Sequence, residues 1–280
     1  MFFEKIITAL QVTMKEPEPF GIYHILALMI AFVCVAICSY ISSWKSEKQL
    51  KYVLAIYSIP TLLLEVIKQI IWSISFTNGD IFIDYPWYIF PFQLCTTPMI
   101  VSIICLFLNK CKLRDYLLSY VAFITILGSI AVMITPADCF VQDVMINIHT
   151  TYLHFGSFVV SCYLIISGEI KATFNCFYKA VITFCVFVAI ATTLNIGMFK
   201  ADILNGETFN MFYISPYFTS TLPIFDKIQL AVPYPLFLMS YVIALSLGGL
   251  AILGCAYGLF KMKQKYGSVS KYIAKAKVKR

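Results

Sequence analysis

Residues 234–260 read YPLFLMSYVIALSLGGLAILGCAYGLF and contain no charged side chain. A helix of about 20 mostly apolar residues crosses the hydrocarbon core of a bilayer, so this stretch predicts a transmembrane helix. Six more segments meet the same requirement, at 23–43, 52–76, 88–109, 116–135, 149–167 and 177–199. The sequence therefore predicts an all-α fold, a polytopic membrane bundle of seven transmembrane helices.

The overall composition agrees with a membrane protein and excludes other classes. Of the 280 residues 60% are hydrophobic and 12% are charged, and the mean hydropathy is +0.84. Soluble domains carry about 25% charged residues, and a soluble fold of this length has too little interior to hide so much apolar surface. Soluble, disordered, collagen-like and nucleic-acid-binding proteins are therefore excluded, and we expect no nucleic-acid partner.

The basic residues indicate the orientation and divide the chain. Sixteen of the 21 Lys and Arg residues lie on one side of the predicted spans and four on the other, with Lys68 inside a span. Cytoplasmic loops carry the excess of positive charge, so we expect the N-terminus outside and the C-terminus in the cytoplasm. We expect an interfacial arm at 1–22, the transmembrane domain at 23–260, and a basic cytoplasmic tail at 261–280 that attracts anionic lipids.

One aromatic segment, 208–225, competes for an eighth span. It contains Pro216 and Pro223, and its insertion would move the basic tail to the outside. We expect the region 200–233 to be an outer loop that covers or re-enters the bundle. Such a loop needs protein or water to satisfy its backbone groups.

The ten cysteines and three histidines show no metal-binding or disulfide pattern. No two cysteines form a CxxC pair, and the histidines do not complete a zinc spacing. We expect no metal, no cofactor and no disulfide framework.

Polar side chains of the predicted helices gather in the outer layer of the bundle. A charged group at membrane depth costs at least ~2.5–3.5 kcal/mol, so such residues are functional candidates. Glu65 and Lys68 are three residues apart and share one helix face. They form either a structural pair or part of a hydrated cavity that orients a polar head group. With Gln93, Asn195 and Asn210 they are our candidates for substrate binding.

Cys95 is the candidate nucleophile. It lies in the sequence PFQLCTTP at 91–98, where Pro98 has no N–H to donate to the Leu94 carbonyl and is expected to bend the helix beside the thiol. A neighbouring imidazole would take the thiol proton during attack. His149 and His154 are five residues apart and point about 140° from one another, so only one can meet the thiol. Depth favours His154 as the base and places His149 at the mouth, unless both histidines are structural.

Several motifs, spread from about 23 to 260, together resemble a known family. They are Pro91-Phe92-Gln93-Leu94-Cys95, His154 with Gly156, Asn195, Asn210-Met211-Phe212 with Pro216, Asp226, and Pro233-Tyr234-Pro235. Their order resembles the YwaF family of bacterial integral membrane proteins, which is related to a eukaryotic multi-pass acyltransferase acting on ether phospholipids. The resemblance implies a bacterial plasma-membrane protein in which Cys95, with a His partner, moves an acyl chain between phospholipids.

The leading hypothesis is therefore a lipid-active acyltransferase or acyl hydrolase with a cavity open to the outer leaflet. Asn195 or Asn210 would donate to the oxyanion, or would only tie down the outer loop. The alternative is a transporter or a solute- or lipid-binding protein, with Glu65, Lys68 and the histidines as ligands or proton carriers. A retinal-type receptor is disfavoured because the last helix has no Lys for a Schiff base.

Overall fold

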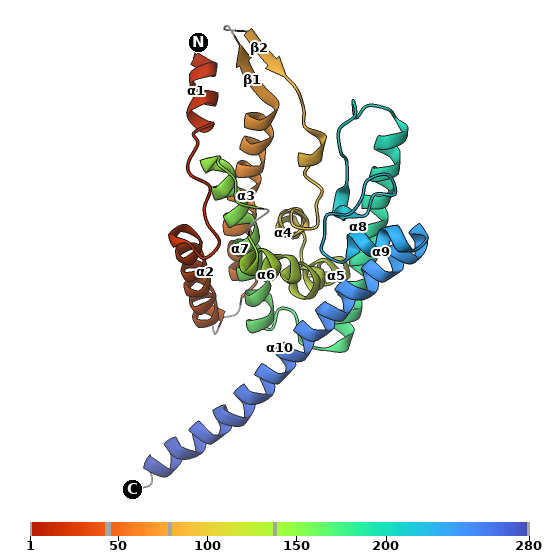
Figure 1. The fold of residues 1–280 in the computed structure, drawn as a ribbon. Coiled ribbons are helices and arrows are strands. Elements are labelled where there is room, and N and C mark those ends of the chain that lie inside the picture. Colours follow the sequence, from red (N-terminus) through yellow and green to blue (C-terminus); the bar gives the residue numbers. More distant parts are fainter. Residues whose placement is uncertain (1, 43–45, 78–79, 137–138, 279–280) are drawn as a thin grey trace.

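The predicted spans appear as helices close to their predicted positions. The structure, a computed structural model, describes residues 2–42, 46–77, 80–136 and 139–278, and for residues 2 and 263–278 it describes only the backbone. The helices along the spans are α2 (Ile22–Ile41), α3 (Glu47–Ser73), α4 (Thr97–Phe107), α5 (Lys112–Tyr120), α6 (Ile126–Ile134), α7 (Val144–Ile166), α8 (Phe174–Lys200) and α10 (Tyr234–Val278). A π-helical turn, η3 (Val121–Thr125), joins α5 to α6 (Figure 1).

In the described part of the chain, five helices are long and apolar enough to cross a membrane. They are α2, α3, the continuous helix Lys112–Ile134, α8 and the Tyr234–Met262 portion of α10. Helix α4 has only 11 residues, and α7, with 23 residues and several buried polar side chains, is not among the five. A mostly helical membrane protein is therefore confirmed, whereas the seven-span topology and its orientation stay predictions.

The predicted third span, 88–109, is wrong in its first part. The chain forms a short 3-10 turn, η2 (Trp87–Ile89), and then runs without regular helix until α4 begins at Thr97. Pro98 is the second residue of α4, and proline is tolerated in the first helical turn because an N–H there has no helical partner. Pro98 therefore begins a helix instead of bending one, and Cys95 lies in the turn before it.

Two helices begin at capping residues outside the apolar segments. The Ser46 hydroxyl accepts a hydrogen bond from the Gln49 N–H at 3.1 Å, and the Thr173 hydroxyl accepts one from Cys176 at 3.4 Å. Such caps satisfy N–H groups that have no partner within the helix. Helices α3 and α8 therefore begin before the predicted residues 52 and 177.

Small elements cover one end of the bundle. Strands β1 (Ile74–Thr77) and β2 (Asp80–Ile83) form an antiparallel hairpin after α3. Helix α1 (Phe2–Leu10) lies at the same end, with Ile7 buried and the ring of Phe3 6.4 Å from that of Phe76 (Figure 1). The Gln11 amide then donates to the carbonyls of Ile71 and Ile74. The N-terminal arm is thus docked on the end of α3.

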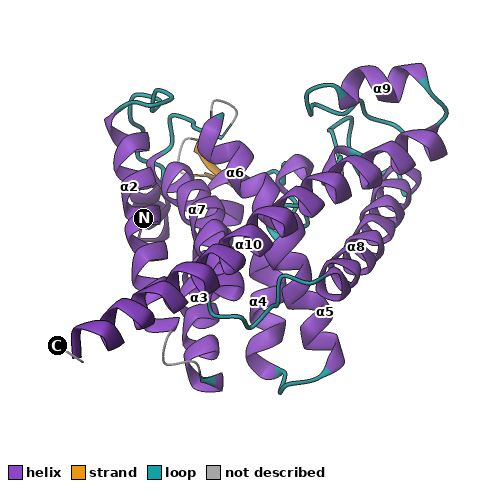
Figure 2. Ribbon diagram, turned by 90° about the horizontal axis from the view of Figure 1, so that it is seen from below, coloured by secondary structure: helices purple, strands orange, loops and turns teal. Residues whose placement is uncertain are grey.

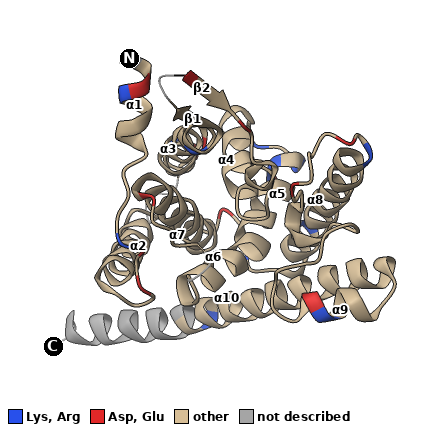
Figure 3. Ribbon diagram, turned by 45° about the horizontal axis from the view of Figure 1, so that its top comes forward, with Lys and Arg blue, Asp and Glu red and all other residues tan. Residues whose placement is uncertain are grey.

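Helix α7 is central to the packing. It lies beside α2, α3 and α6, while α8 packs against α5 and α10 (Figure 2). Large aromatic side chains, including Tyr120, Tyr163, Phe184 and Tyr241, are fully buried between these helices. Charged residues are sparse along the bundle (Figure 3). The side chains of the basic tail after Met262 lie outside the described residues, so the expected attraction of anionic lipids stays a prediction.

Candidate functional site

Glu65, Lys68 and His149 form a buried polar cluster between α3 and α7. Lys68 Nζ lies 2.7 Å from Glu65 Oε1, and His149 Nε2 lies 2.8 Å from Glu65 Oε2. The side chains of Glu65 and His149 are each 4% exposed, and that of Lys68 is 12% exposed. The pairing of Glu65 with Lys68 agrees with their predicted common helix face, and α7 adds a histidine to the same carboxylate.

Two further side chains connect this cluster to the segment before α4. The Gln69 amide donates to Glu65 Oε1 at 2.7 Å and to the Ile89 carbonyl at 2.9 Å, and the Tyr85 hydroxyl donates to Gln69 Oε1 at 2.8 Å. Burial and the nearby Glu65 carboxylate raise the pKa of Tyr85 above its usual value. The hydroxyl of Tyr85 therefore remains a hydrogen-bond donor at neutral pH.

Cys95 lies in a hydrogen-bonded turn immediately before α4. The N–H groups of Thr96 and Thr97 donate to the Gln93 carbonyl, at 3.0 Å and 3.2 Å. The Leu94 carbonyl, which we predicted to be free, accepts the Thr97 hydroxyl at 2.8 Å. The Cys95 side chain is half-buried against the core.

The two histidines occupy different surroundings. His149 contacts Glu65, whereas His154 is buried farther along α7 and makes no hydrogen bond within the described chain. Among the described residues, no hydrogen bond joins the Cys95 thiol to either histidine. The predicted nucleophile–base pair therefore stays a prediction, and His149 is the histidine that lies within ion-pair distance of a carboxylate.

A second set of buried amides binds the outer loop. Gln93 accepts from the Phe212 N–H at 2.8 Å and donates to the Asn210 carbonyl at 3.1 Å. Asn195, on α8, accepts from the Met211 N–H at 2.7 Å and donates to the Met211 carbonyl at 3.0 Å. Gln93, in the turn before α4, and Asn195, on α8, thus satisfy consecutive backbone groups of one loop segment, as a buried loop requires.

Asn210 and Gln229 satisfy the next part of this loop. Asn210 accepts from the Ser215 N–H at 2.8 Å and donates to the Thr219 carbonyl at 3.2 Å. Gln229, on α9 (Phe225–Ala231), accepts from Ser220 at 2.6 Å and donates to the Ser215 carbonyl at 2.8 Å. The amides of Gln93, Asn195 and Asn210 therefore hold the loop in place, and their predicted roles toward substrate and oxyanion stay predictions.

The loop is held in a strained conformation at η4 (Met211–Tyr213). Phe212 and Tyr213 both have φ of +59°, the left-handed region that costs a bulky residue roughly 1–2 kcal/mol. The Phe212 ring is fully buried and stacks on Phe92, with ring centroids 5.7 Å apart. The bonds from Gln93 and Asn195 and this packing stabilise the strained turn. Gln93 precedes Cys95 by two residues, so the strained turn is bonded to the segment that carries the thiol.

The sequence did not reveal Tyr85 or Gln229 as parts of these networks, because their hydrogen-bond partners lie on segments that the folded structure brings together. Gln69 is four residues after Glu65 on α3, so helical spacing places it beside the carboxylate. Within the described ranges no three His, Cys, Asp or Glu side chains are placed to hold a metal ion.

The comparison with known proteins gives one family. A sequence model of the TMEM164 family, a multi-pass membrane family, matches residues 19–253. No curated protein and no solved structure matches the chain. The matched range runs from the residues before α2 to the middle of α10, so it contains both polar networks and Cys95.

Proposed function

The chain belongs to the TMEM164 family, and from this membership and the geometry around Cys95 we propose an integral membrane enzyme that transfers or hydrolyses phospholipid acyl chains. The observation that carries the proposal is the buried Glu65–His149 contact of 2.8 Å between α3 and α7, which both pack against α4, the helix that follows Cys95. A nucleophile, a base and a residue that orients the base are the parts of thiol-dependent acyl transfer.

Cys95 is the proposed nucleophile because of its place in the chain. A thiol in apolar surroundings is protonated and unreactive until a base takes its proton. The start of α4 and the ammonium of Lys68 favour negative charge near this turn, and the Glu65 carboxylate opposes it. Cys105, by contrast, is fully buried in the core of α4.

His149 is the base that the contacts favour. Glu65 fixes the orientation of its ring and stabilises the imidazolium that forms when the thiol proton is taken. We predicted His154 as the base from depth, and it remains the second candidate. Either histidine must approach the thiol, because nucleophile and base pairs work at ~2.6–3.2 Å and are often looser without substrate.

The proposed reaction proceeds through a thioester. The sulfur attacks the carbonyl carbon of a phospholipid ester, the ester C–O bond breaks, and the proton taken by histidine passes to the departing lysophospholipid oxygen. The hydroxyl of an acceptor lysophospholipid, or water, then attacks the thioester and gives its proton to histidine. Cys95 leaves as the thiolate and regains this proton. Phospholipids of a bacterial plasma membrane are the proposed substrates.

A matched pair of cysteine variants tests the proposal. Purified protein in lipid nanodiscs receives phospholipid with a labelled acyl chain and an unlabelled lysophospholipid acceptor. We expect Cys95→Ala to lower transfer by orders of magnitude and Cys105→Ala to preserve it, since only the first removes the nucleophile. An acyl label on Cys95 that hydroxylamine releases would identify the thioester. Equal turnover in both variants would overturn the proposal.

The same cluster also supports a second candidate, a transporter. Intramembrane Glu, Lys and His side chains in contact are typical of proton relays. In that case Glu65→Gln would abolish substrate-dependent proton uptake into proteoliposomes, and Cys95→Ala would leave the uptake unchanged. The Cys95→Ala and Glu65→Gln variants together therefore distinguish an enzyme from a transporter.

A further inference from the structure

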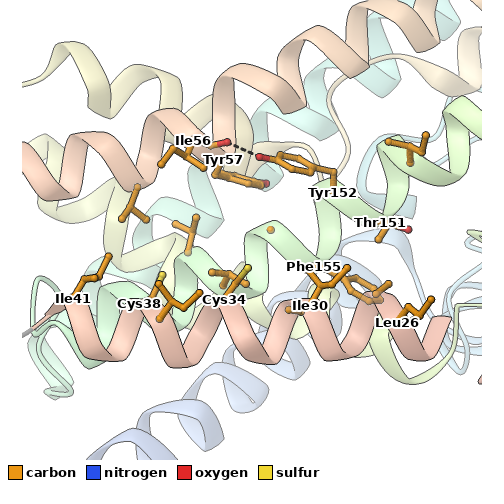
Figure 4. Close-up of a pocket in the computed structure, with 18 of the residues that line it drawn as sticks. Leu26, Ile30, Cys34, Cys38, Ile41, Ile56, Tyr57, Thr151, Tyr152 and Phe155 are labelled. Atoms are coloured by element: carbon orange, nitrogen blue, oxygen red, sulfur yellow. Dashed lines mark hydrogen bonds between the residues drawn. The ribbon is translucent and has the colours of Figure 1, made fainter. Parts of the chain in front are cut away.

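A long apolar groove lies between α2, α3 and α7. Its volume is about 640 Å³, and its lining includes Leu26, Ile30, Cys34, Ile56, Tyr57 and Phe155 (Figure 4). Ligand sites in proteins have volumes of about 300–1,000 Å³, so the groove is large enough for a ligand.

The dimensions of the groove determine what can occupy it. Helix α2 lines it from Leu26 to Ile41, and at about 1.5 Å per residue this is about 22 Å. The groove is therefore long and runs along α2.

The apolar lining disfavours an extended peptide and water as occupants. An extended peptide would leave its N–H and C=O groups unpaired among apolar side chains, and water is disfavoured there for the same reason. Helices α2 and α3 are both long and apolar enough to span the membrane, so the groove lies at membrane depth. One leaflet of hydrocarbon is about 15 Å thick, which is shorter than the groove. We propose that the groove binds one long acyl chain of a membrane phospholipid.

One end of the groove lies at the level of the Glu65–His149 contact. Leu26 and Thr151 form this end (Figure 4), and Thr151 follows His149 by two residues on α7. The hydroxyls of Tyr23 and Thr151, 2.9 Å apart, make this end polar, whereas Cys38 and Ile41 line the other end. A chain with its ester at Thr151 would point its methyl end toward Ile41. That the bound chain is the acyl substrate rests on the proposed function.

Photolabelling tests the groove without relying on turnover. The probe is lysophosphatidylcholine with a palmitoyl chain that carries a diazirine near its methyl end, added to the purified protein in nanodiscs. We expect the label on peptides of α2, α3 and α7 that line the groove. Cys34→Phe fills the middle of the groove and should lower this labelling at least tenfold. Val33→Phe, on the neighbouring exposed position outside the groove, should leave it unchanged.

A second pair of variants replaces the first if Cys34→Phe does not fold. Ile30→Trp narrows the groove from an exposed position, and Met29→Trp is its control outside the lining. Equal labelling of a filling variant and its control, or label only on helices that do not line the groove, would overturn the groove proposal. Labelling of Cys95→Ala separates the two proposals. Labelled groove peptides with undiminished turnover would leave the groove proposal standing and remove Cys95 as the nucleophile.

Discussion

Glu65 is the residue on which the intramembrane charges depend. It contacts Lys68 and His149 at once, and both it and Lys68 are removed from most of the solvent. We expect Glu65→Gln to destabilise the protein by about 3–5 kcal/mol, because it leaves the Lys68 ammonium buried without a counter-charge. The thermal unfolding midpoint in detergent, followed by intrinsic fluorescence, measures this change.

An exposed ion pair of similar geometry provides the control. Lys15 Nζ lies 2.6 Å from Glu18 Oε1, but both side chains are mostly exposed. Glu18→Gln should leave the unfolding midpoint unchanged, since solvent screens surface pairs. If both substitutions had the same small effect, water would solvate Lys68, and the buried cluster would not exist as described.

Gly156 allows α7 to approach α3 closely. A Cβ atom at this position would lie 2.7 Å from Tyr57 Cδ2, and Tyr57 is buried and unable to move away cheaply. We expect Gly156→Ala to lower stability by about 1–3 kcal/mol through this overpacking. Gly128→Ala is the control, because no atom lies within 4 Å of its Cβ position and alanine favours helix by about 1 kcal/mol. A Gly156→Ala variant as stable as Gly128→Ala would show that α3 and α7 are not packed at Tyr57.

Among the elements, the strained turn at Met211–Tyr213 depends on side chains from other helices. Asn195→Leu leaves the buried Met211 N–H and C=O without partners, at about 1–3 kcal/mol for each group. Local opening should then be at least about tenfold more frequent, since each 1.4 kcal/mol is a factor of ten. Hydrogen–deuterium exchange of peptides covering 209–220 measures this increase.

Asn147 gives a matched control at another loop. Its amide accepts from the Val141 N–H at 3.0 Å and donates to the Val141 carbonyl at 2.7 Å. Asn147→Leu should therefore speed exchange near Val141 and leave peptides 209–220 protected. Unchanged exchange of peptides 209–220 in Asn195→Leu would contradict the role of this amide in holding the turn.

Elements were predictable from the sequence where a single local property decides them. Long apolar stretches located α2, α3, α8 and α10 because lipid and the protein interior favour the same side chains. The segment 88–96 was mispredicted because its apolar residues fit a helix equally well, while Pro98 sets the start of α4. The pairing of Glu65 with Lys68 followed from helical spacing. Tying down the outer loop was one of the two roles that the sequence suggested for Asn195 and Asn210. The contact of Gln93 did not follow from spacing, because its partner Phe212 is 119 residues away.

For the whole molecule, the basic residues predict one orientation in the membrane. A reporter fused after Arg280 should be cytoplasmic, and one inserted at Gly79, between β1 and β2, should be outside. Alkaline phosphatase and a fluorescent protein that folds only in the cytoplasm give opposite readings at each site. An external C-terminal reporter would contradict the orientation and the placement of Cys95 near the outer leaflet.

The pairing of Glu65 and Lys68 within one helix also affects how the chain is made. Both residues are synthesised and fold together in α3, well before the ribosome reaches His149. The helix can therefore leave the translocon with its two charges already neutralised, and partition into lipid without waiting for a later segment. His149 joins the carboxylate only after α7 has been inserted. During biosynthesis the two charges thus enter the bilayer before the site is complete.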